Sequence, residues 1–62
     1  MALMKVLEEF EGPPILVDPD AVAVIRPAGR DGTLCTLLFH HGQYSVTVKG
    51  HMLDVARALE RF

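Results

Sequence analysis

Two segments in the middle of the chain alternate apolar and polar residues around a glycine. Residues 34–40 (LCTLLFH) and 43–49 (QYSVTVK) flank His41-Gly42, and glycine tolerates the positive φ of a tight turn. Side chains alternate between the two faces of a strand. A two-residue turn therefore predicts a β-hairpin whose core face carries three opposed pairs: Phe39 with Tyr44, Leu37 with Val46, and Cys35 with Val48.

The opposite face of this hairpin mixes hydroxyl, apolar and polar side chains. The same register pairs Leu34 with Lys49, Thr36 with Thr47, Leu38 with Ser45, and His40 with Gln43. A one-residue slip would mix the two sets of side chains, so the alternation fixes the register. Leu34 and Leu38 are left outside the expected core.

Residues 52–62 (MLDVARALERF) predict an amphipathic helix. The apolar residues follow helical spacing: Met52, Val55, Ala56 and Leu59, with Phe62 near the same stripe. Asp54 suits the helix dipole in the first turn, and Gly50 is the expected N-cap. Because so short a helix is marginal alone, we expect it to pack on the core face of the hairpin, against Leu37, Phe39, Tyr44 and Val46.

The region before the hairpin contains a turn and two short apolar segments. Asp18-Pro19-Asp20 predicts a turn, preceded by a strand at residues 15–17. Val22 and Ile25 have helical spacing, which predicts one helical turn before a strand that ends near Arg26. Residues 27–32 (PAGRDG) then predict a connecting loop.

Residues 3–10 are compatible with either a helix or a strand. Leu3, Val6, Leu7 and Phe10 match the helical template, and local propensities agree with it. Residues 11–14 (EGPP), however, lead into the strand at 15–17 as a hairpin turn would. The local pattern slightly favours the helix.

Length and composition limit the class of protein. The chain has 62 residues, of which 50% are hydrophobic and 23% charged, which predicts a single domain over residues 1–62 and excludes a disordered tail. So small a domain usually needs a disulfide, a metal or a partner, and one cysteine cannot form an internal disulfide. The net charge of −2 argues against nucleic-acid binding. The longest apolar run, residues 21–25, is too short to span a membrane, and a cytoplasmic location is expected.

The residues that could act in catalysis or in metal binding are better explained by structural roles. Zinc could use Cys35 with His40, His41 or His51, but the register places Cys35 and His40 on opposite faces. Ser45 and His40 are diagonal neighbours without a carboxylate to orient the histidine. Asp18 and Asp20 lack the further ligands of a calcium loop. We therefore expect no catalytic residue, no metal and no cofactor, and a protein that is not an enzyme.

A basic surface is a further candidate for binding. It would draw on five residues: Arg26, Arg30, Lys49, Arg57 and Arg61. No aromatic residues are interleaved with them for base stacking, and Asp54 and Glu60 dilute the helix. A solvated face is the favoured interpretation.

The surface that we favour as functional is the second face of the hairpin. Leu34 and Leu38 are apolar residues without an assigned cover, unless the N-terminal segment packs over them. Contiguous exposed apolar surface on a small protein marks a contact site. Thr36 and Thr47 lie between the leucines and suit a symmetric contact. The sequence therefore predicts a protein interface, and a homodimer in particular, at Leu34, Thr36, Leu38 and Thr47.

The order of elements resembles the FlbD/SwrD-type small proteins of bacterial flagellar operons. The matching residues cover nearly the whole chain: Gly12, residues 15–17, residues 18–20, Val22, Ile25, Gly42, Tyr44 and Val46. The family implies a small, non-catalytic, cytoplasmic protein linked to motility, and it favours a strand at the N-terminus. The departures are Gly50, where the family tends to have a polar cap, the turn at residues 12–14, and the basic loop at residues 26–30.

A similar layout ends the longer and more basic LytTR DNA-binding domain. It makes a DNA-binding or transcription-regulating module the alternative function, and an inhibitor from a phage or mobile element is a third for which the sequence gives no feature. The expected fold is α+β, a small antiparallel sheet of three to five strands with one C-terminal helix packed on one face. The expected function is a non-catalytic protein-binding adaptor.

Overall fold

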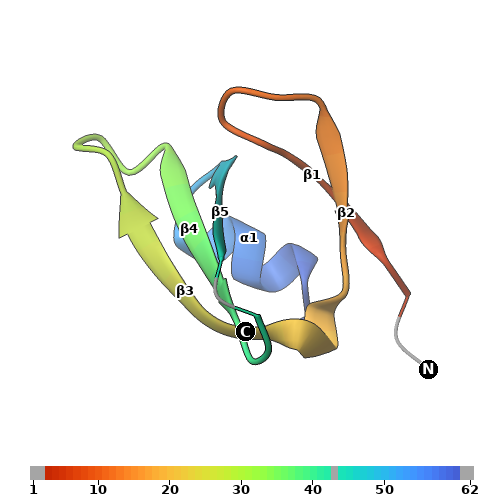
Figure 1. The fold of residues 1–62 in the computed structure, drawn as a ribbon. Coiled ribbons are helices and arrows are strands. Elements are labelled where there is room, and N and C mark those ends of the chain that lie inside the picture. Colours follow the sequence, from red (N-terminus) through yellow and green to blue (C-terminus); the bar gives the residue numbers. More distant parts are fainter. Residues whose placement is uncertain (1–2, 43, 61–62) are drawn as a thin grey trace.

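The computed structural model describes residues 3–42 and 44–60 of the chain. Its elements are β1 (Lys5–Glu8), β2 (Pro14–Val17), a 3-10 helix (Pro19–Ala21), β3 (Val22–Ala28), β4 (Leu34–Phe39), β5 (Ser45–Lys49) and α1 (Met52–Ala58). They form a two-stranded and a three-stranded antiparallel sheet, the latter in the order β3-β4-β5 (Figure 1). The predicted α+β class, with one C-terminal helix against an antiparallel sheet, is confirmed.

The pairing of β4 with β5 has the register that the alternation predicts. Leu37 lies opposite Val46 and Cys35 opposite Val48, and the side chains of Cys35, Leu37 and Val48 are fully buried. The face of the three-stranded sheet that carries them is called the inner face below. It is the centre of the core.

One detail of the hairpin end differs from expectation. Tyr44 does not belong to the core, because its side chain is 64% exposed. It lies just beyond the last paired residues, where its ring contacts that of half-buried Phe39 with a centroid distance of 5.2 Å. Gly42 has the positive φ (91°) that the turn requires. The expected pairing of His40 with Gln43 lies outside the described residues.

The helix packs on the inner face, but it is shorter than expected and is capped differently. Val55 and Leu59 are buried in the core cluster with Leu37, and α1 ends at Ala58 with Leu59 as its C-cap. Arg61 and Phe62 lie outside the described residues. No helix in the described part of the chain is long and apolar enough to cross a membrane.

The N-cap of α1 is His51 and not Gly50. The Nδ1 atom of His51 accepts a hydrogen bond from the Leu53 N–H at 3.1 Å. Gly50 instead forms the turn into the helix, with φ 123°. Its N–H donates to the Thr33 carbonyl at 2.7 Å. An added Cβ there would lie 3.1 Å from Val55 Cγ2. Glycine is therefore required for the turn, and the side chain of the next residue supplies the cap.

Strand β3 contains a bulge that explains a misleading pattern. Val22 pairs with Phe39 and Val24 with Leu38, so the register shifts between them. The extra residue brings Val22 and Ile25 to the same face of a strand, although their spacing is helical. The predicted helical turn at these residues is therefore wrong, and the 3-10 helix precedes them. The strand also continues through Pro27 to Ala28, which an edge strand tolerates.

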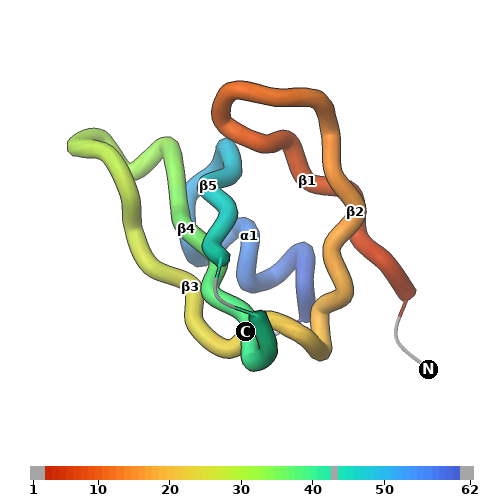
Figure 2. Tube along the Cα trace, viewed as in Figure 1, coloured from red at the N-terminus to blue at the C-terminus, as the bar shows by residue number. Residues whose placement is uncertain are grey.

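The N-terminal segment forms a strand, as the family resemblance favours. Strand β1 pairs with β2, and their inward residues Leu7 and Val17 join the core cluster. The hairpin meets β5 where the Phe10 N–H donates to the Thr47 carbonyl at 2.9 Å. The hairpin and α1 thus share the inner side of the three-stranded sheet (Figure 2).

The His51 cap gives a first test of this structure. Replacing the cap acceptor in His51→Ala should lower the free energy of unfolding by about 1 kcal/mol, whereas Asp is itself a strong N-cap and His51→Asp should retain stability. Urea denaturation followed by circular dichroism, at one protein concentration, measures both. His41→Ala, in the exposed turn, is the control and should change stability by less than about 0.5 kcal/mol. A His51→Ala protein as stable as wild type would contradict the assignment.

Candidate protein interface

The four residues predicted to form an interface lie together on the face opposite the core. Leu34, Thr36 and Leu38 alternate with the buried residues of β4, and Thr47 lies opposite Thr36 on β5. All four side chains are partly buried. Strand β3 adds its own alternate residues to the same face. The outer face is defined here by nine residues: Val24, Arg26, Ala28, Leu34, Thr36, Leu38, Ser45, Thr47 and Lys49.

A hydroxyl pair stands at the centre of the outer face. The Oγ1 atoms of Thr36 and Thr47 lie 3.0 Å apart and share a hydrogen bond. A polar group is costly to bury when it has no partner. Because each hydroxyl already has one, covering this part of the face costs less than covering two isolated hydroxyls.

No described element covers the outer face. The N-terminal segment, which was a possible cover for Leu34 and Leu38, packs through Leu7 and Val17 into the inner cluster. Val24, beside Leu38, remains 45% exposed. The apolar part of the face is therefore open at the β3 side and partly open along β4.

The sequence analysis missed several members of this surface. Val24 and Arg26 reach it only because β3 carries a bulge and pairs with β4. Phe10, which is 46% exposed, lies beside Thr47 together with Glu9 and Glu11. These residues join the outer face or lie beside it through pairing between segments that are distant in the sequence. A local sequence pattern does not predict such pairing.

A second exposed apolar surface lies on the N-terminal hairpin. Val6 and Leu16 are opposite each other in register and are 66% and 64% exposed. Next to them is a groove of about 360 Å³, whose walls include Leu16, Phe39 and Tyr44. The run at residues 15–17 was apolar at every position, and this was the one available signal that both faces of β2 carry apolar side chains.

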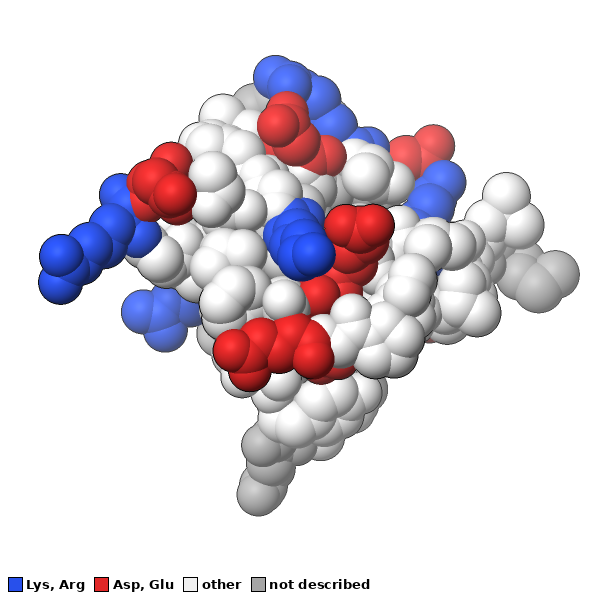
Figure 3. Space-filling view, turned by 90° about the horizontal axis from the view of Figure 1, so that it is seen from above, with Lys and Arg blue, Asp and Glu red and all other residues white. Residues whose placement is uncertain are grey.

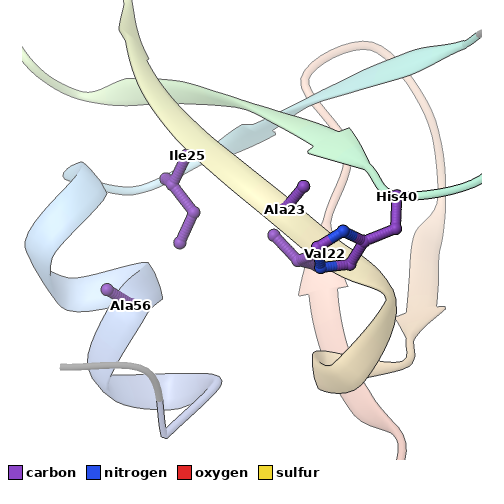
Figure 4. A pocket seen from close by; sticks show the side chains of 5 residues that line it. All are labelled: Val22, Ala23, Ile25, His40 and Ala56. Carbon is purple, nitrogen blue, oxygen red and sulfur yellow. The ribbon is translucent and has the colours of Figure 1, made fainter.

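A shallow pocket lies between β3 and α1 (Figure 4). It has a volume of about 410 Å³ and is lined by Val22, Ala23, Ile25, His40 and Ala56. Ile25 points from β3 toward α1, where Ala56 lies (Figure 4). His40 is the one titratable residue among the five. Ser45, its suggested partner as a nucleophile, does not line the pocket and pairs with Leu38.

The residues considered as metal ligands are dispersed. Cys35 is buried on the inner face, whereas His40, His41 and His51 are exposed. Within residues 3–42 and 44–60, no three His, Cys, Asp or Glu side chains are grouped closely enough to hold a metal ion. Asp18 has a turn role, because its Oδ1 accepts the Asp20 N–H at 2.9 Å. Burial raises the pKa of the Cys35 thiol.

Charges of both signs are interspersed on the surface. Figure 3 shows acidic and basic groups side by side on one face, without a broad area of one sign. Arg57 lies 3.4 Å from Asp54 on α1, while Arg30 is in the loop after β3. Arg26 and Lys49 belong to the outer face, and Arg61 lies outside the described residues. The candidate basic surface is therefore divided among separate parts of the fold.

Comparison with known proteins adds no assignment: no protein-family model, no curated protein and no solved structure matches the chain.

The burial of Cys35 gives a second test. The thiolate is the reactive form of cysteine, and burial both raises the pKa and blocks access. An aromatic disulfide reagent should therefore modify the native protein at least about 100-fold more slowly than the protein in urea. In a Cys35→Ala background, His41→Cys places a thiol in the exposed turn, away from the outer face, and should react fast without denaturant. A native Cys35 that reacts at the rate seen in urea would contradict the burial.

Proposed function

We propose that this protein is a small, non-catalytic protein-binding module that associates with itself through the outer face and acts as an adaptor. One observation carries the proposal: the outer face carries three apolar side chains, half-exposed Val24 and partly buried Leu38 and Leu34, and no described helix or strand packs over it. An uncovered apolar strip beside a polar rim is typical of a contact site.

The size of the protein supports self-association in particular. A small domain buries a limited share of its surface and gains stability from a partner. A standard interface buries about 800 Å² per partner, close to a fifth of the 4460 Å² surface of this chain. The Thr36 and Thr47 hydroxyls at the centre of the outer face already bond each other, so the same surface on two copies can meet there without burying an unpaired hydroxyl.

The biological setting rests on the family resemblance. The turn at residues 18–20, the glycine turn at Gly42 and the residues Tyr44 and Val46 are similar to FlbD/SwrD-type proteins. We therefore place the proposed adaptor in the cytoplasm of a bacterium, in the flagellar system. Recovery of flagellar export or motor proteins with the native chain would support this setting.

One observation favours the alternative of a DNA-binding module. Arg26 and Lys49 lie on the outer face together with hydroxyl groups that can contact phosphates. The net charge of −2 and the mixed signs in Figure 3 weigh against it. Binding of duplex DNA that falls steeply with salt concentration would favour this alternative over the protein interface.

The central test of the proposed function is the variant Leu38→Glu. The wild-type protein should be a dimer at micromolar concentration by light scattering. A carboxylate beside Val24 in the contact would be desolvated, so Leu38→Glu should weaken the dimer by more than about 2 kcal/mol and give a folded monomer. Circular dichroism and amide NMR spectra monitor the fold.

A matched control separates this effect from general surface change. Val6→Glu introduces the same charge at a strand residue that is 66% exposed and lies away from the outer face. It should leave the dimer intact. A wild-type monomer, or equal dissociation in both variants, would refute self-association through the outer face.

A further inference from the structure

The cap of α1 determines which nitrogen of His51 carries a proton. A backbone N–H can only donate, so the Nδ1 atom that receives the Leu53 N–H at 3.1 Å must be unprotonated. The neutral ring then carries its proton on Nε2. A protonated ring has a proton on both nitrogens and cannot accept this hydrogen bond. The capped helix therefore requires a neutral His51.

Protonation has a second effect in the same direction. The first turn of a helix presents N–H groups without helical partners and the positive end of the helix dipole, so a cation is unfavourable there. His51 immediately precedes Met52, the first residue of α1, and its side chain is exposed to solvent. A proton taken up from solvent would thus remove the acceptor and place a positive charge at this end of the helix.

The loop that lies beside His51 contains two charged residues. A Cβ added at Gly32 would lie 3.4 Å from His51 Cδ2, so this loop is in contact with the ring. Arg30 and Asp31 are the charged residues of the loop. The Asp31 carboxylate accepts hydrogen bonds from the Thr33 hydroxyl and N–H at 2.7 and 3.2 Å, which lower the pKa of Asp31. Asp31 therefore keeps its charge over the range in which histidines titrate.

The segments on either side of His51 contribute charges that are also constant in this range. Lys49 ends β5, and Asp54 lies in the first turn of α1, 3.4 Å from Arg57. Within residues 3–42 and 44–60, no carboxylate lies close enough to His51 to form an ion pair. Histidine is the side chain whose charge ordinarily changes between about pH 5 and 8. His51 is therefore the group at this helix end that responds to pH in that range.

We infer that His51 is a pH-sensitive cap: α1 is capped while the ring is neutral and loses its cap when the ring is protonated. Val55 and Leu59 of α1 belong to the core cluster, so a weaker helix destabilises the whole fold. The unfolded chain does not need a neutral ring and binds the proton more readily, so stability rises with pH. The contribution of the cap is present at pH 8 and is lost as the pH falls to about 5. The inference is independent of the proposed function, because His51 is not part of the outer face.

The test follows stability with pH at one protein concentration. Asn is a strong N-cap that does not titrate, so His51→Asn keeps the hydrogen-bond acceptor at every pH. Between pH 8 and pH 5, the unfolding equilibrium constant of the wild type should rise roughly tenfold more than that of His51→Asn. Urea denaturation followed by circular dichroism measures both. The same pH dependence in the two proteins would overturn the inference.

A double variant separates His51 from the other two histidines of the chain. His40 and His41 are both exposed at the turn between β4 and β5, and His40→Gln with His41→Gln leaves His51 as the one histidine. This variant should keep the pH dependence of the wild type. If the dependence disappears, it originates at the β4–β5 turn and the inference is wrong.

Nuclear magnetic resonance gives a readout that does not depend on unfolding. At pH 8, the ring nitrogens of His51 should show an unprotonated Nδ1 and a protonated Nε2. As the pH falls, the amide signal of Leu53 should shift with the same midpoint as the ring of His51, and this shift should be absent in His51→Asn. A proton on Nδ1 at pH 8, or a Leu53 amide that does not follow the ring, would contradict the pH-sensitive cap.

Discussion

The burial of one face of β4 is the constraint on which the other features of the fold depend. Cys35 and Leu37 are fully buried there, and the helix, the N-terminal hairpin and both neighbouring strands pack around them. Because side chains alternate along a strand, burying these residues forces Leu34, Thr36 and Leu38 to the opposite face. The core and the proposed interface are therefore two consequences of one register. A one-residue slip would turn the core residues outward and the interface residues inward.

Packing of the remaining elements on one side of the sheet explains why its second face stays open. The sheet has two faces, and the chain supplies two further elements, the hairpin of β1 and β2 and the helix α1. Both pack on the inner side, where Leu7, Val17, Val55 and Leu59 complete one cluster. Distributing them over both faces would divide a small core into two smaller ones, which would bury less apolar surface per residue. The described residues therefore form a single core and leave one face of the sheet uncovered.

The sequence pattern predicted those parts of the fold that depend on residues close together in the chain. The register of the hairpin and the buried stripe of the helix follow from alternation and helical spacing, and both are confirmed. The bulge in β3 could not be recognised, because an extra residue in a strand gives Val22 and Ile25 the same spacing as a helical turn. The cap was missed because Gly50 is needed for its backbone conformation, which leaves His51 to accept the hydrogen bond. For the site, β4 and β5 supplied Leu34, Thr36, Leu38 and Thr47, whereas Val24, Arg26 and Phe10 join them through pairings distant in sequence.

The outer face is one side of a three-stranded sheet, and this limits what its charged residues can contribute to binding. A deep pocket recognises a partner by shape, but a sheet face presents rows of side chains that fit a second sheet at several offsets. Apolar residues such as Leu34 and Leu38 favour contact at any of these offsets, since the hydrophobic effect is not directional. Charged groups at the rim add little affinity, yet they penalise each wrong offset.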